Sequence, residues 1–165
     1  MDAYRPDAWT AAFTAVAGAS AALTGLLFVA LSINLERVLK GPGLIGRAVE
    51  VLVLLVAVLI LAILLLMPAQ GPTSAAFEIL TVALMTIVWL TYVHVRSPLR
   101  TLGVTRANFT MRVSGDHLGP ILLVIGGVSL WIQSGGGLYW VVPGLIAAMV
   151  AAIIGAWVLL VEILR

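Results

Sequence analysis

The sequence predicts an all-α integral membrane protein with five transmembrane helices, and three observations carry this prediction. Of the 165 residues, 62% are hydrophobic and 10% are charged, whereas a soluble domain has about 25% charged residues. The apolar residues form five runs close to the roughly 20 residues that cross a bilayer. Basic residues gather in alternate connections between these runs, which is typical of cytoplasmic loops. A soluble enzyme, a nucleic-acid-binding module and a disordered chain are therefore excluded.

The predicted spans belong to one transmembrane domain, 1–165, and each has visible boundaries. They cover residues of about 10–35, 48–67, 75–95, 118–133 and 139–163. Trp9 precedes the first span, and Pro68 ends the second because proline disrupts a continuing helix. The turn sequence around Pro72 precedes the third, and the glycine run 135–137 separates the last two. The fourth span is short and glycine-rich, so a tilted or re-entrant segment is the alternative.

The charge distribution predicts that the N-terminus lies outside and the C-terminus inside. The connections after the first and third spans hold seven of the nine basic residues, and Arg165 ends the chain on the same side. The connections after the second and fourth spans hold none, and Arg5 alone lies on the other side. By the positive-inside rule the basic side is cytoplasmic, where loop arginines can also contact anionic lipid. Five aromatic residues form a predicted outer belt: Tyr4, Trp9, Trp131, Tyr139 and Trp140.

The first span carries two neighbouring stripes of small and hydroxyl-bearing residues. One stripe includes Gly18, Ala22 and Gly25, whose spacing predicts close contact with another helix. The other supplies the candidate pore-lining residues, which are Thr14, Ala17, Ala21, Thr24, Phe28, Leu31 and Asn34. In one interpretation the hydroxyls bond their own helix and the small stripe packs within one subunit. In the other, copies of this span surround an axis, and its bulky residues form a hydrophobic constriction.

The second and fifth spans are predicted to face different surroundings. The second is bulky nearly all round, which we interpret as a lipid-facing helix at the rim. The fifth has small residues at four-residue spacing, which predicts a second helix-contact face. Its members are Gly144, Ala148, Ala152 and Ala156.

No ionisable residue is expected near the bilayer centre, where it would indicate a functional site. Three acids lie at the membrane edges: Glu36, Glu50 and Glu78. Pairing of Glu50 with Arg47 or with a loop arginine is one interpretation, and ion coordination or a proton step is the other. The pair Asp116–His117 is interpreted as loop rather than as half of a metal site. With no cysteine and no nucleophile–base motif, we expect no enzyme activity, no metal and no cofactor.

Two resemblances involve the first span. Residues 18–34, 47–50 and 67–71 resemble a group of small bacterial membrane proteins, some of which carry the label modulator of FtsH protease. This resemblance implies a bacterial cytoplasmic membrane protein and a membrane protease as a possible class of partner. Residues 20–35 resemble the pore helix of Orai calcium channels, but Ile33 stands where that family has its selectivity glutamate. The second resemblance implies a pore helix without calcium selectivity.

The predicted function is a homo-oligomeric membrane protein that forms a pore or channel-like assembly lined by the first span. Its partners are the lipid bilayer and copies of itself, and no nucleic acid is expected. The alternative is a non-conducting accessory or regulatory subunit of a larger membrane complex, such as a membrane protease.

Overall fold

The computed structural model describes residues 2–41, 43–96 and 106–164, and every regular element in these ranges is helical. Five of these helices are long and apolar enough to cross a membrane. They are α1 Thr10–Ile33, α3 Leu44–Leu64, α4 Pro72–Arg96, α5 Arg106–Trp131 and α6 Leu138–Leu164. The short elements are η1 Asp2–Tyr4, η2 Pro6–Trp9 and α2 Leu35–Lys40. The prediction of five membrane helices is confirmed, and the architecture supports a multi-pass transmembrane protein.

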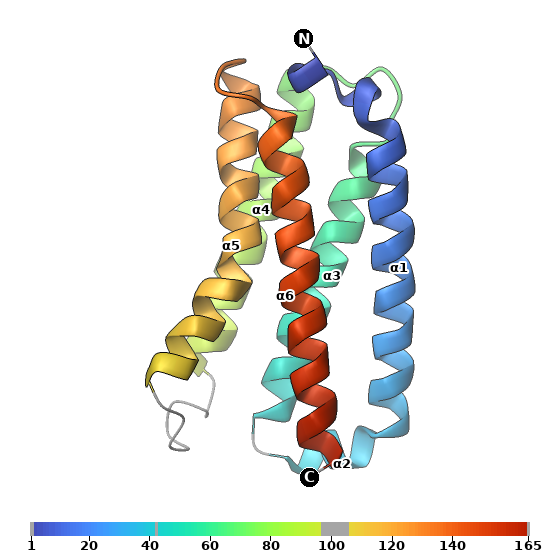
Figure 1. The fold of residues 1–165 in the computed structure, drawn as a ribbon, viewed down its shortest axis with the longest axis vertical. Helices are drawn as coiled ribbons and strands as arrows, with labels where there is room; N and C mark the ends of the chain where they lie inside the picture. The colour runs from blue at the N-terminus through green and yellow to red at the C-terminus, as the bar shows by residue number, and fades with distance from the viewer. Residues whose placement is uncertain (1, 42, 97–105, 165) are drawn as a thin grey trace.

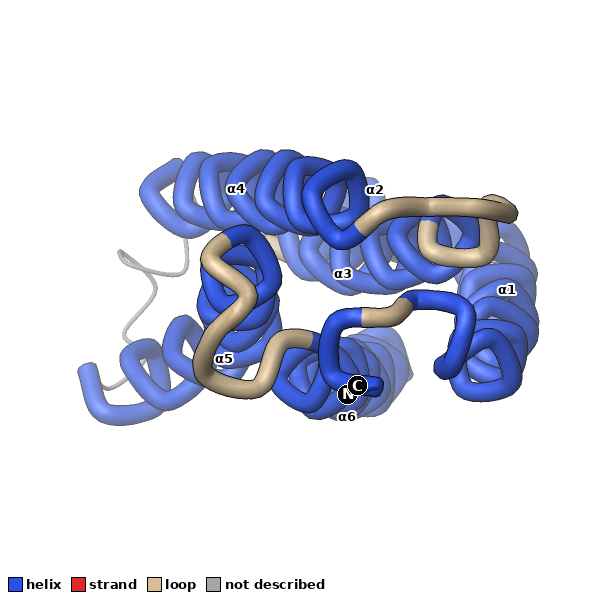
Figure 2. The backbone as a smooth tube through the Cα atoms, turned by 90° about the horizontal axis from the view of Figure 1, so that it is seen from above, coloured by secondary structure: helices blue, strands red, loops and turns tan. Residues whose placement is uncertain are grey.

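Four of the long helices form a closed bundle, and the fifth lies beside it. Helix α3 packs against α4 and α6, and α5 packs against the same two helices. Helix α1 contacts mainly α3 and touches α6 much less. The end-on view shows α1 at one end of the arrangement (Figure 2). The two ends of the chain lie at opposite ends of the bundle (Figure 1), as an odd number of spans requires.

The predicted position of the second span is wrong, because α3 is packed between α1, α4 and α6. In the most apolar stretch of α3, 44% of the residues are buried, compared with 11% in the corresponding stretch of the span Pro6–Ile33. The bulky side chains of α3 fit against small residues on neighbouring helices. A Cβ added to Gly155 of α6 would lie 2.8 Å from the side chain of Val51. The bulky side chains on the buried face of α3 therefore pack against neighbouring helices instead of facing lipid.

The fourth span is longer than predicted, because α5 begins at Arg106 rather than near 118. The expected loop 96–117 is therefore helical from 106 onward, while 97–105 lie outside the described residues. Polar side chains in this first part of α5 find partners on other helices, so the helix continues through them. Pro120 lies inside α5 and cannot donate the usual backbone hydrogen bond. Figure 1 shows that the N-terminal part of α5 bends away from α6, and a proline inside a helix is a common cause of such a bend.

Beyond that bend, α5 and α6 approach closely through small residues. A Cβ on Gly119 would lie 2.6 Å from the backbone nitrogen of Ala148. A Cβ on Gly126 would meet Val141 at 2.6 Å, and one on Gly144 would meet Leu123 at 3.0 Å. These contacts leave no space for larger side chains, so the α5–α6 interface depends on its glycines.

Candidate functional site

Six ionisable side chains gather at one end of the bundle, near the C-terminus of the chain. They come from four helices and are defined here as the polar cluster: Arg47, Glu50, His94, Arg112, Asp116 and Glu162. Ionisable groups within transmembrane helices are costly, face the protein interior and commonly mark function. The polar cluster is therefore the candidate functional site of this chain.

Helical spacing explains how each helix contributes to the cluster. Arg47 and Glu50 lie three residues apart in α3, which places them on neighbouring positions of one face. Arg112 and Asp116 lie four residues apart in α5 and share a face in the same way. His94 comes from the last turn of α4.

Glu50 and His94 are at the centre of the cluster. The Arg112 guanidinium donates to Oε2 of Glu50. The Nε2 atom of His94 lies 3.2 Å from Oδ2 of Asp116 and 3.6 Å from Oε1 of Glu50. The side chains of Glu50, His94 and Asp116 are only 4%, 5% and 13% exposed, so water screens them weakly. One imidazole nitrogen thus faces two buried carboxylates.

The outer part of the cluster is a second ion pair. Arg47 NH1 lies 2.9 Å from Oε2 of Glu162, and the Arg47 side chain is 14% exposed. Counting both pairs, the cluster holds three carboxylates and two arginines. One negative charge is left over when the His94 ring is neutral. A cation bound at the cluster would balance that charge.

Three buried side-chain atoms of the cluster lack a hydrogen-bond partner. They are Oε1 of Glu50, Nδ1 of His94 and Nε of Arg47. Leaving a buried polar atom unpaired costs about 1–3 kcal/mol, and more for a charged group. Such atoms call for an explanation, and an ion at the site is one of the accepted ones.

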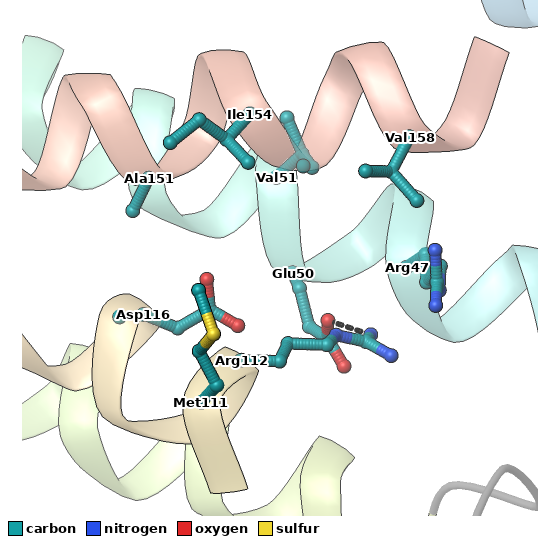
Figure 3. Close-up of a pocket in the computed structure, with 11 residues that line it drawn as sticks. Arg47, Glu50, Val51, Met111, Arg112, Asp116, Ala151, Ile154 and Val158 are labelled. Atoms are coloured by element: carbon teal, nitrogen blue, oxygen red, sulfur yellow. Dashed lines mark hydrogen bonds and ion pairs between the residues drawn. The ribbon is translucent and has the colours of Figure 1, made fainter. Parts of the chain in front are cut away.

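A pocket of about 460 Å³ opens beside the cluster, between α3, α5 and α6. Glu50, Arg112 and Asp116 lie on its polar side, where Figure 3 shows the contact between Glu50 and Arg112. Ile154 and Val158 of α6 form part of its apolar wall. The pocket lies where α5 diverges from α6, so the bend in α5 gives the cluster access from outside.

Toward the other end of the molecule, the four-helix bundle is closed by apolar side chains. Its largest fully buried members include Leu54, Val58, Leu61, Ile79, Leu90, Leu130 and Leu145. In the described part of the chain, the buried polar residues outside the cluster are Ser20, Thr86 and Ser129, and each donates to a backbone carbonyl. Among the described residues, the buried ionisable groups are therefore confined to the cluster end of the bundle.

The three predicted edge acids have different surroundings. Glu36 forms an exposed pair with Lys40 at 2.5 Å. Glu78 accepts a hydrogen bond of 2.6 Å from Gln70. Glu50 belongs to the polar cluster, where it pairs with Arg112, one of the arginines that the sequence assigned to a loop.

Asp116 and His117 have different hydrogen-bond partners, although the His117 ring also lies 5.4 Å from the His94 ring. Asp116 faces His94, whereas Nε2 of His117 lies 3.2 Å from Oγ1 of Thr91. The donor group that is close enough for a metal ion is Glu50, His94 and Asp116, whose ligand atoms lie within 4.8 Å of one another. Sequence reasoning expected no metal site and missed this group, because its members come from three different helices. The one signal available was that all three residues lie at the same predicted membrane edge.

Helix α1 turns one face to the bundle and leaves the other open. The buried face carries Phe13, Ser20 and Leu27 at seven-residue spacing. Ser20 is fully buried and donates a 2.7 Å hydrogen bond to the carbonyl of Leu55 on α3. This interhelical bond fixes which side of α1 faces the protein.

The predicted contact residues of α1 lie on the open face, so the small stripe does not pack within one subunit. Gly18, Ala22 and Gly25 are exposed, and a Cβ on either glycine would have nothing within 4 Å. The candidate pore-lining residues are divided between the two sides of the helix. Thr14, Ala21 and Phe28 are exposed, whereas Ala17, Thr24, Leu31 and Asn34 are partly buried.

Apart from Ser20, the polar side chains within and just after α1 that are named here bond their own helix. Thr14, Thr24 and Ser32 each donate to the carbonyl four residues earlier, at 2.7–2.8 Å. Asn34 does the same at 2.9 Å. In α6, by contrast, Gly144, Ala148 and Ala152 are buried, and Ala156 is partly buried.

Comparisons with family models, curated proteins and solved structures found no match for this chain.

Proposed function

We propose that this chain is a non-conducting accessory subunit of a membrane complex and that it contacts its partner through the open face of α1. The open face comprises Thr14, Gly18, Ala21, Ala22, Gly25 and Phe28. One observation carries the proposal: α1 lies outside the closed four-helix bundle and presents its glycines away from that bundle.

The composition of the open face supports a helix as the missing neighbour. A glycine in a helix costs about 1 kcal/mol relative to alanine, and neither Gly18 nor Gly25 relieves a contact within this chain. Small residues permit two helices in a membrane to approach closely, which strengthens van der Waals packing between them. Copies of this chain and a larger complex, such as a membrane protease, are both able to supply that helix.

Two features favour a non-conducting role. The four-helix bundle is closed by apolar side chains above the polar cluster. The hydroxyl groups of Thr14 and Thr24 donate to their own helix, so they present fewer donors to a hydrated pore. A conducting path would therefore have to form between protomers.

Such a path is the second candidate function: a homo-oligomeric pore lined by α1. It is favoured by the position of Thr14, Ala21 and Phe28 on the open face, where a ring of copies would bring them together. In both proposals the N-terminus lies outside, the basic end contacts anionic lipid, and the protein resides in the bacterial cytoplasmic membrane.

Single-cysteine crosslinking tests the proposal, since the natural chain has no cysteine. Ala22→Cys reports on the open face, and Met85→Cys, at a residue of α4 that is 70% exposed, is the matched lipid-facing control. In membranes of the native host, we expect Ala22→Cys to give a crosslinked adduct with a different protein and Met85→Cys to give none. Native mass analysis of the uncrosslinked complex should show the same partner at fixed stoichiometry.

The other outcomes separate the two functions. Adducts between copies, together with ion flux that increases in Leu31→Ala, would support the pore and overturn the accessory role. No adduct at position 22 above the control would overturn both proposals. Gly25→Leu should abolish any specific adduct while leaving the protomer folded, because the open face has room for the side chain.

A further inference from the structure

We propose that Glu50, His94 and Asp116 form a binding site for a divalent transition-metal ion. The three side chains come from α3, α4 and α5 and each offers one ligand atom. One imidazole nitrogen and two carboxylate oxygens are a donor set that binds Zn²⁺ and similar ions. The site is independent of the open face of α1 and of the function proposed for it.

The spacing of the donor atoms fits one metal ion. Metal–ligand bonds of about 2.0–2.2 Å in a tetrahedral site place neighbouring ligand atoms about 3.4 Å apart. Nε2 of His94 lies 3.2 Å from Asp116 Oδ2 and 3.6 Å from Glu50 Oε1. Both separations are close to the edge of a tetrahedron around one ion, and all three ligand atoms lie within 4.8 Å of one another, so rotation of the carboxylate side chains is enough to bring the oxygens onto one ion.

The unpaired atom at this position is a second, independent observation. Oε1 of Glu50 is buried, accepts no hydrogen bond and points toward the same imidazole nitrogen that faces Asp116. The other carboxylate oxygen of Glu50 accepts from Arg112, which holds the group in place. Charge-assisted bonds of this kind orient ligating carboxylates in metal sites. A bound cation would also balance the extra negative charge of the polar cluster.

The pocket completes the site. Glu50 and Asp116 both line it, so an ion can enter from the pocket without unfolding the bundle. Three protein ligands leave one tetrahedral position for water or a small ligand, as in zinc sites that are not purely structural. The donors contain no thiolate, and imidazole with carboxylates favours a borderline ion such as Zn²⁺ over Mg²⁺.

Metal binding to the purified full-length protein tests the proposal. Zn²⁺ is titrated into chelator-treated protein in detergent and followed by calorimetry, with Mg²⁺ as the control ion. We expect one Zn²⁺ per chain and no saturable binding of Mg²⁺. Co²⁺ should give the visible absorption bands of a tetrahedral site, and this readout requires no variant.

Variants assign the site to these residues. Asp116→Asn and His94→Gln should each weaken Zn²⁺ binding by at least about tenfold, the lower end of the losses seen when metal-site residues are altered. Glu162→Gln is the matched control, because it removes one carboxylate from the same cluster but pairs with Arg47 outside the donor group. It should retain wild-type affinity.

Two results would overturn the proposal. The first is wild-type protein that binds no Zn²⁺ and shows no tetrahedral Co²⁺ spectrum. The second is equal loss of binding in Glu162→Gln and Asp116→Asn, which would show attraction to general negative charge. Circular dichroism and gel filtration confirm that each variant compared is folded.

Discussion

Replacement of Arg112 by glutamine is expected to destabilise the bundle strongly, because it leaves a buried carboxylate without its positive partner. Glu50 is 4% exposed and Arg112 is 19% exposed, so the pair is largely shielded from water. Removing one partner of a buried ion pair costs about 3–5 kcal/mol. Because about 1.4 kcal/mol corresponds to a tenfold change, the folding equilibrium should fall by roughly a hundredfold to a few thousandfold.

Equilibrium unfolding in mixed detergent micelles measures this change, with a chelator present so that bound metal does not contribute. Lys40→Gln is the control, because its pair with Glu36 is 74% and 82% exposed. Exposed pairs contribute only about 0–1 kcal/mol. The double variant Glu50→Gln/Arg112→Gln should be more stable than Arg112→Gln, since no charged carboxylate remains at that position. Equal stability losses in Arg112→Gln and Lys40→Gln would contradict a buried Glu50–Arg112 ion pair. The same holds if the double variant is no more stable than Arg112→Gln.

Two further predictions concern helix packing. Gly119→Ala should destabilise the protein by about 1–3 kcal/mol through overpacking, because the new Cβ would lie 2.6 Å from a backbone nitrogen of α6. Gly115→Ala in the same helix is the control. Its new Cβ meets nothing within 4 Å, so this variant should be about 0.5–1 kcal/mol more stable than the wild type. Thermal unfolding of the two variants compares these effects directly, and equal behaviour would contradict the close α5–α6 approach. Ser20→Ala should cost about 0.6 kcal/mol and at most about 1.7 kcal/mol, the average and the maximum for interhelical hydrogen bonds in membranes, because the hydroxyl bond to Leu55 is lost. Thr14→Ala, which breaks only a bond within α1, should change stability less in the same denaturant titration.

Most of the secondary structure was predictable from the sequence, because a spanning helix must satisfy its own backbone hydrogen bonds in lipid. Long apolar runs therefore become helices whatever surrounds them. The exception was the first part of α5, where Arg112, Asp116 and His117 look like loop residues. These side chains are tolerated in a helix because Glu50, His94 and other groups on neighbouring helices pair with them. That pairing depends on which helices are adjacent, and a hydropathy pattern does not contain this information.

The candidate site was predictable only in part for the same reason. Pairing of Glu50 with an arginine from the connection after the third span was one of the sequence interpretations, and Arg112 fits it. The convergence with His94 and Asp116 was not predicted, because Arg112 lies 62 residues from Glu50 and Asp116 lies 22 residues from His94. Such distances contain no local spacing rule of the kind that identifies a metal motif within one helix.

The positions of α1 and α3 show why residue size alone does not identify a lipid-facing helix. Lipid tails are as apolar as leucine, so bulky side chains gain little from facing lipid rather than protein. A helix–helix contact differs from a lipid-facing surface in that side-chain sizes are complementary, so that a large side chain on one helix packs against a small residue on the next. Val51 of α3 meets Gly155 of α6 in this way, whereas Gly18 and Gly25 of α1 meet no side chain of their own chain. The central position of α3 follows from this rule, and the open face of α1 is where the proposed partner would supply the large side chain.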